Sequence, residues 1–154
     1  MIDQRLRDAL APTGTLRAGI NLSNFLLVSA RRTGRNAARQ APHVRNKTTG
    51  SGADAIIRKG TNPRVDSYSA FFENDKVTST GLAGFLTGRG CDRLTMVGLA
   101  TDYCVAWSAL DGVAEGFEVT VLLSACRAID LDGSLDAALT EMRQAGVTLL
   151  LDNG

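Results

Sequence analysis

The feature that most constrains this chain is a repeated order of strand-like and helix-like segments from residue 54 onward. The apolar, strand-like runs are Ala55 to Ile57, Leu94 to Val97, Val119 to Leu123, and Val147 to Leu151. The helical candidates, each followed closely by a glycine, are Thr80 to Gly88, Cys104 to Glu115, and Ser134 to Ala145. Helical crossovers join parallel strands. The pattern therefore predicts an α/β fold with a three-layer, doubly wound, mainly parallel sheet.

Residues 1–53 do not share this order, being rich in Arg, Asn, Thr and Gly. They contain one good strand candidate, Asn24 to Ala30, and a marginal helix candidate, Met1 to Leu10. A chain of 154 residues is long enough for one domain. We therefore predict a single domain over 1–154, in which 1–53 is an atypical segment with atypical or missing strands and 54–151 carries the regular order of strands and helices.

The charge is unevenly spread along the chain. Residues 1–57 hold nine Lys or Arg against three acids, and residues 58–154 hold eight against thirteen. Because aromatic residues are almost lacking in the basic part, we interpret it as a solvated surface and expect no nucleic-acid partner. The apolar runs are shorter than the ~20 residues that cross a bilayer, and no secretory signal is recognisable. We expect no membrane partner and a cytoplasmic location.

The counts of cysteine and histidine limit the chemistry. Cys91, Cys104 and Cys126 are an odd number without metal-type spacing, so a disulfide framework or zinc knuckle is not expected. His43 is the only histidine, which excludes a histidine-rich metal site within one chain. We interpret Cys91 and Cys126 as small buried apolar side chains, since neither opens a helix after a strand.

Cys104 lies where a predicted strand passes into a predicted helix, in the segment Gly98 to Val105. Thr101 or Asp102 can act as N-cap, which places Cys104 in the first helical turn. The backbone N–H groups and the helix dipole at that end favour a thiolate and can hold an oxyanion. A nucleophile is one interpretation of Cys104, and a buried apolar residue is the other.

Lys59 follows the first apolar run and is the second candidate for chemistry. A lysine at a strand end can point into the site beside a thiol, or it can extend its ammonium to solvent. The next segment, Val65 to Phe72, carries three aromatic residues, Tyr68, Phe71 and Phe72. They can line a flat apolar pocket or pack in the core.

Three of these stretches, Lys59 to Pro63, Val65 to Phe72, and Gly98 to Val105, resemble the signatures of bacterial nicotinamidases, in the same order and with similar separation. The resemblance continues through Gly116 to Val119, Ala125 to Ala128, and Met142 to Leu150, and covers roughly residues 54–151. The chain is similar to the nicotinamidase/pyrazinamidase family of the isochorismatase-like cysteine hydrolases. This implies the isochorismatase-like hydrolase fold and a small-molecule amide as substrate.

The resemblance implies an amidohydrolase that converts nicotinamide and water to nicotinate and ammonia through a cysteine thioester, as in NAD salvage. It implies that Cys104 is the nucleophile and Lys59 the catalytic lysine. The backbone N–H groups of Ala100 and Cys104 are expected to form the oxyanion hole, with a cis peptide between Leu99 and Ala100. The residues expected to bind the substrate ring are Tyr68, Phe71 and Tyr103.

The chain also departs from the family pattern. It has no D-x-Q-N-D-F motif, whose first aspartate is the family's general base. The family binds a divalent metal such as Zn, Mn or Fe through D-x-H and further histidines. Because His43 is the only histidine in this chain, we expect no identifiable metal or other cofactor here.

These departures predict impaired activity, and the alternative interpretation is an inactive remnant or non-catalytic subunit of the same fold. Because the resemblance begins abruptly near Asp54, we expect that residues 1–53 arose from an alternative start, a frameshift or a gene-model error; a designed or heavily diverged variant is the alternative. A homo-oligomer is possible, since missing strands expose a sheet edge.

Overall fold

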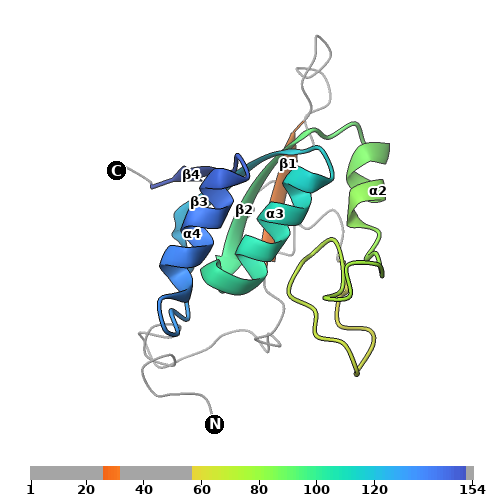
Figure 1. Cartoon of the computed structure of the whole chain (residues 1–154). Coiled ribbons are helices and arrows are strands. Elements are labelled where there is room, and N and C mark those ends of the chain that lie inside the picture. The colour runs from red at the N-terminus through yellow and green to blue at the C-terminus, as the bar shows by residue number, and fades with distance from the viewer. Residues whose placement is uncertain (1–25, 32–56, 152–154) are drawn as a thin grey trace, which may run out of the picture.

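A computed structural model describes residues 26–31 and 57–151, and its centre is one four-stranded sheet. The strand order is β1 (Leu26–Arg31), β2 (Arg93–Leu99), β3 (Glu118–Arg127) and β4 (Thr148–Leu150) (Figure 1). β2, β3 and β4 pair in parallel, and β1 pairs with β2 in the antiparallel direction. The sheet is therefore mainly parallel, and the carboxyl ends of β2, β3 and β4 lie at one edge.

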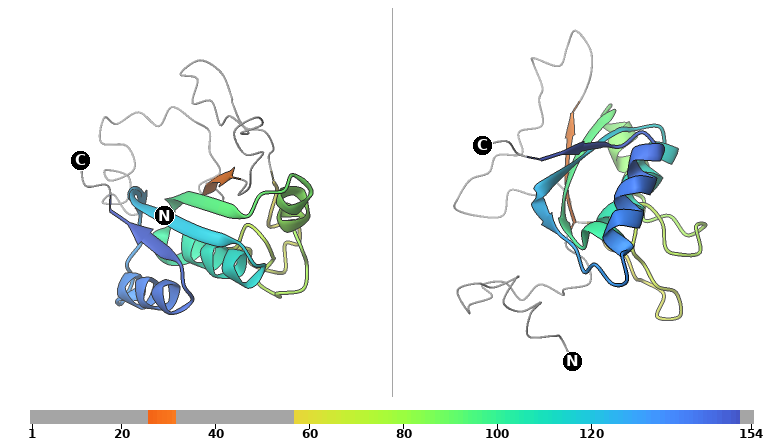
Figure 2. Two further views of the ribbon diagram at one scale, coloured as in Figure 1. Left: turned by 90° about the horizontal axis from the view of Figure 1, so that it is seen from above. Right: turned by 60° about the vertical axis from the view of Figure 1, so that its left-hand side comes forward.

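Helices cover one face of this sheet. A π-helical turn, η1 (Thr101–Val105), leads directly into α3 (Ala106–Ala114), and α4 (Ser134–Gln144) connects β3 to β4. Figure 2 shows α3 and α4 side by side on the same face, while α2 (Leu82–Gly88) precedes β2. The structure describes α2, α3 and α4 but not residues 1–25 and 32–56, so the three-layer part of the prediction stays untested.

The hydrophobic core lies between the sheet and these helices. Leu94 and Met96 alternate with exposed or half-buried neighbours along β2, because successive strand side chains point to opposite faces. Val119 and Val121 do the same on β3. The buried face of η1, α3 and α4 completes the core with Val105, Ala106, Ala109, Ala138 and Met142.

Most elements predicted from residue 80 onward are confirmed, with changed ends. β3 continues four residues beyond Leu123, to Arg127, and β4 is shorter than predicted. The strand predicted at Asn24 to Ala30 is confirmed over its described residues, from Leu26 onward. Ile57 lies in no strand, and the rest of that predicted run is outside the described residues, as is the predicted helix Met1 to Leu10. Within the described ranges, no helix is long and apolar enough to span a membrane.

Candidate active site

Cys104 lies at the carboxyl end of β2, in the turn that begins the central helix. The peptide bond between Leu99 and Ala100 is cis, as the resemblance predicted. The N-cap of η1 is Ala100, so the prediction that Thr101 or Asp102 caps the helix is wrong. Both lie inside the turn, because the helix begins at Thr101 with a π-helical turn that closes with a hydrogen bond from the Ala106 N–H to the Thr101 carbonyl.

Lys59 reaches Cys104 from a segment 45 positions earlier. Its Nζ lies 3.5 Å from Cys104 Sγ, and it donates to the carbonyl oxygens of Ser67, at 2.7 Å, and Tyr68. An ammonium has three N–H donors, so these three partners fix its direction. Burial lowers the pKa of Lys59 below its ordinary value, while the nearby Cys104 and Glu73 act in the opposite direction. The interpretation that Lys59 extends to solvent is wrong.

Two tyrosines and a tryptophan pack together beside this pair. The Tyr68 ring meets Tyr103 at 5.8 Å and Trp107 at 5.3 Å between centroids, both edge to face. Trp107 is not among the residues that the sequence predicts for the site, although its i+4 spacing from Tyr103 places both on one helix face. Tyr68, Tyr103 and Trp107 are all half-buried.

Phe71 does not share that environment. It is 1% exposed and packs on Phe117 within the hydrophobic core, with 5.9 Å between ring centroids. Of the two interpretations given for the aromatic segment, core packing describes Phe71, and the half-buried Tyr68 is the one that lies near Cys104.

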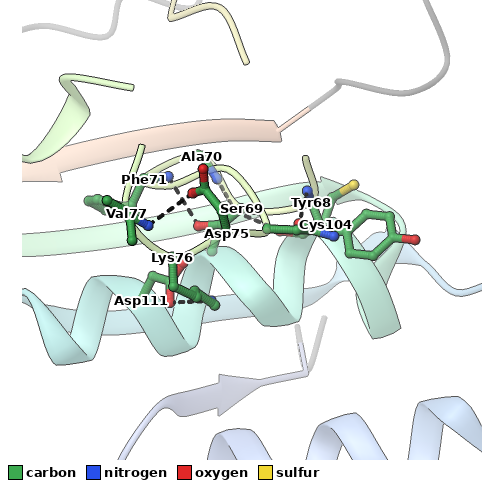
Figure 3. Close-up of polar contacts among 11 residues, drawn as sticks. Tyr68, Ser69, Ala70, Phe71, Asp75, Lys76, Val77, Cys104 and Asp111 are labelled. Atoms are coloured by element: carbon green, nitrogen blue, oxygen red, sulfur yellow. Dashed lines mark hydrogen bonds and ion pairs between the residues drawn. The ribbon is translucent and has the colours of Figure 1, made fainter. Parts of the chain in front are cut away.

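Ser108 joins the aromatic segment to the helix that carries Cys104. The fully buried Ser108 hydroxyl donates to the Cys104 carbonyl at 2.6 Å and accepts from the Ala70 N–H at 2.8 Å. Figure 3 shows the irregular segment 68–71 beside this helix, with Tyr68 and Cys104 near one end. In the sequence, the only sign of this link is the position of Ser108, four residues after Cys104.

An ion pair lies farther along the same helix. Lys76 Nζ is 2.7 Å from Asp111 Oδ1 (Figure 3). The same nitrogen is 4.4 Å from the centre of the Trp107 ring. Asp111 is mostly buried, so the ammonium supplies a charge partner to a carboxylate that burial would otherwise disfavour. The pair thus holds the loop around Lys76 against α3.

Asp102 ties the Cys104 turn to the loop that follows β3. Its carboxylate accepts from the N–H groups of Ile129, at 3.0 Å, and Asp130, at 2.8 Å, and from the Ser134 hydroxyl at 2.5 Å. Asp102 is 6% exposed. It therefore acts as an internal anchor between η1 and the start of α4.

The other two cysteines are buried, as predicted. Burial raises the pKa of the Cys126 thiol, partly offset by a backbone hydrogen bond from Gly98 and by Arg127. Within residues 26–31 and 57–151 no group of three or more His, Cys, Asp or Glu side chains could hold a metal ion, and His43 lies outside these ranges. The described residues thus do not fit the divalent metal that the family implies.

The fold and this arrangement define a class of protein, namely a mainly parallel α/β protein with a cysteine and a lysine paired where a central strand meets its helix. A family model described as isochorismatase domain matches residues 28–152. The chain belongs to the isochorismatase family. The match begins within β1, upstream of the resemblance that starts near residue 54.

Individual relatives are nicotinamidases. The nicotinamidase of Acinetobacter baylyi is 54% identical over 95 residues, which cover 62% of this chain and 44% of that protein. The chain spans about half the length of the curated relatives it matches.

Solved structures of similar proteins superpose on the same region. An Acinetobacter baumanii nicotinamidase/pyrazinamidase has a TM-score of 0.64 and 52% identity, covering 65% of this chain and 48% of that one. A protein from L. infantum, solved in complex with nicotinate, has a TM-score of 0.61 and 42% identity, covering 65% and 50%.

Proposed function

We propose that this chain is a nicotinamidase-type amidohydrolase in which Cys104 is the nucleophile and Lys59 its charge partner. The observation that carries this proposal is the 3.5 Å contact between Lys59 Nζ and Cys104 Sγ at the start of a helix. An ammonium beside a sulfur at a helix N-terminus is the environment that favours a thiolate. The similarity to nicotinamidases supports nicotinamide as the substrate.

In the proposed reaction the Cys104 thiol gives its proton to solvent and the thiolate attacks the amide carbon, forming a C–S bond. The carbonyl oxygen becomes an oxyanion, for which we propose the N–H groups of Ala100 and Cys104 as donors. The C–N bond then breaks, and the nitrogen takes a proton from solvent and leaves as ammonia. Water cleaves the thioester, releasing nicotinate and restoring the thiol.

The proposed ring-binding wall is the half-buried aromatic group of Tyr68 and Tyr103, with Trp107 packed behind Tyr68. Tyr68 is joined to the reactive pair through its carbonyl oxygen, which accepts a hydrogen bond from Lys59. A flat aromatic amide bound there would lie next to the Cys104 sulfur. Phe71 is proposed to support this wall from the core.

We propose further that turnover is slow. The sequence has no D-x-Q-N-D-F motif to supply a general base, and general acid–base help is typically worth about 10² to 10⁴ in rate. The alternative, a non-catalytic subunit of the isochorismatase fold, is favoured by the same departure.

Ammonia release from nicotinamide, measured with purified protein, tests the proposal. We expect turnover that is lost in Cys104→Ala and kept in Cys91→Ala, which removes another buried thiol. Parallel reactions with added Zn²⁺, Mn²⁺ or Fe²⁺ test a metal requirement. A folded protein without turnover in every condition would favour the non-catalytic alternative.

A further inference from the structure

Glu73 is a buried carboxylate whose partners lie directly beside Lys59. It is 2% exposed. Its Oε1 accepts from the N–H groups of Gly60 at 3.0 Å and Thr61 at 3.2 Å, and from the Thr61 hydroxyl at 3.3 Å. Its Oε2 also accepts from the Gly60 N–H, at 3.2 Å. The carboxylate thus holds the two residues that immediately follow Lys59.

The next residue, Asn74, holds the other side of the lysine site. Its Oδ1 accepts from the Tyr68 N–H at 2.9 Å, and its own N–H donates to the Asp66 carbonyl at 2.9 Å. The Ser67 and Tyr68 carbonyls that bind the Lys59 ammonium lie in this same stretch. Glu73 holds the backbone that follows Lys59, and Asn74 holds the segment whose carbonyls accept from the Lys59 ammonium. The two residues are adjacent, so one short segment supports both sides of the lysine.

A tight turn keeps these two residues in place. The Glu73 N–H donates to the Thr78 carbonyl, and the Glu73 carbonyl accepts from the Lys76 N–H, both at 2.9 Å. Asp75 closes the turn by accepting from the N–H groups of Val77 and Thr78. These hydrogen bonds therefore hold in place the segment that carries the Glu73 carboxylate.

The charge of Glu73 matters as well as its hydrogen bonds. Burial of Lys59 disfavours its ammonium, and the charges that oppose this among the described residues are those of Cys104 and Glu73. Cys104 is negative only after it has lost its proton, whereas a carboxylate is ionised near neutral pH. Glu73 thus supplies a negative charge that favours the ammonium form of the half-buried Lys59 before Cys104 ionises.

We propose that Glu73 is a positioning residue, which acts through Lys59 to hold a charged ammonium against the Cys104 sulfur. This inference rests on the proposed function, because it assigns a cause to the Lys59–Cys104 pair. It goes beyond that function in naming a residue that touches neither sulfur nor substrate.

The direction in which loss of the Glu73 charge shifts the pH of Cys104 alkylation separates this role from a direct charge effect on the sulfur. A negative charge that acted on Cys104 directly would oppose thiolate formation, so its removal would lower the pH at which Cys104 becomes reactive. A charge that acts through Lys59 supports the thiolate's partner, so its removal raises that pH. Alkylation of Cys104 by iodoacetamide across a pH series, quantified by peptide mass spectrometry, measures the midpoint without requiring amidase activity.

In Glu73→Gln we expect the labelling midpoint to rise by about half a pH unit or more. Glu73→Asp keeps the charge on a shorter side chain and should give an intermediate midpoint. Glu115→Gln, the same change at an exposed position, should leave it unchanged. In a Lys59→Met background, Glu73→Gln should no longer raise the midpoint.

An unchanged or lowered midpoint in folded Glu73→Gln overturns the inference, as does an equal rise in the Lys59→Met background. If both Glu73 variants fail to fold, Glu73 determines the fold and the positioning role is likewise overturned. Failure of the proposed function looks different, because wild-type Cys104 would then label no faster than Cys91 and Cys126.

Discussion

The ammonium nitrogen of Lys59 lies 3.5 Å from the sulfur of Cys104, although the two residues are 45 positions apart in the sequence. Two separate features of the fold position the two atoms. The turn after β2 places the sulfur at the start of a helix, while the carbonyls of Ser67 and Tyr68 direct the lysine. The Lys59–Cys104 pair therefore depends on both of these supports.

Replacement of Lys59 by methionine removes the ammonium and keeps an unbranched side chain. Because a neighbouring cation favours the thiolate, we expect alkylation of Cys104 at neutral pH to slow by about tenfold, which corresponds to about one pH unit in the midpoint. Any ammonia release should fall further, by about 10² or more. Arg64→Met, which removes an exposed cation nearby, is the control and should match the wild type. Equal labelling of both variants would contradict a role for Lys59.

Replacement of Ser108 by alanine breaks the link between the aromatic segment and the Cys104 helix. The Ala70 N–H loses its acceptor next to a fully buried position, so we expect the free energy of unfolding to fall by about 1–3 kcal/mol. Urea denaturation followed by circular dichroism measures this loss. Ser124→Ala, at an exposed position on β3, should change the free energy of unfolding by less than about 0.5 kcal/mol. A Ser108 variant as stable as this control would show that the link is not needed.

The sequence predicts those parts of the fold that depend on patterns among neighbouring residues. The alternation of Leu94 and Met96 on β2, and the order of strand and helix around Cys104, follow from side-chain periodicity. The pairing of Lys59 with Cys104 came from family resemblance, since spacing alone left Lys59 with two directions.

What sequence did not predict depends on contacts between irregular segments. Asp102 has the chemistry of an N-cap, but its carboxylate binds a loop 27 to 32 positions later instead of its own helix. Glu73 gave no signal because most of its hydrogen bonds come from the backbone N–H groups of Gly60 and Thr61, which almost any residue carries. The antiparallel direction of β1 likewise leaves no mark in its own apolar pattern.

Gly112 on α3 provides a test of core packing. A Cβ atom there would lie 3.1 Å from Val119 Cγ2 and 3.3 Å from both Met96 Cε and Phe71 Cε2, closer than most real contacts. We expect Gly112→Ala to destabilise the protein by about 1–3 kcal/mol, because added volume in a packed core forces side chains to move. Gly84→Ala on α2, where a Cβ meets nothing within 4 Å, should instead stabilise by up to about 1 kcal/mol. Thermal unfolding of the two variants should shift in opposite directions, and a shared direction would contradict the packing described here.

Asp102 provides a test of pH dependence. Burial by itself raises the pKa of Asp102, but hydrogen bonds from Ser134, Ile129 and Asp130 outweigh burial and hold this pKa below its ordinary value. A carboxyl group whose pKa is lower in the folded than in the unfolded chain stabilises the fold fully above the unfolded value, about 3.9, and this contribution is lost as the pH falls through the folded value.

We therefore expect Asp102→Asn to lower the free energy of unfolding by about 2 kcal/mol near neutral pH, because an amide nitrogen cannot accept from the loop N–H groups. The difference from wild type should shrink as the pH falls below about 4, where the unfolded wild-type chain begins to bind a proton that the folded Asp102 carboxylate still excludes. Urea unfolding at a series of pH values measures both effects. Asp132→Asn, at an exposed position in the same loop, should show neither effect. A deficit for Asp102→Asn that stays constant down to pH 3 would mean that its cause is the shape of the side chain and not its charge.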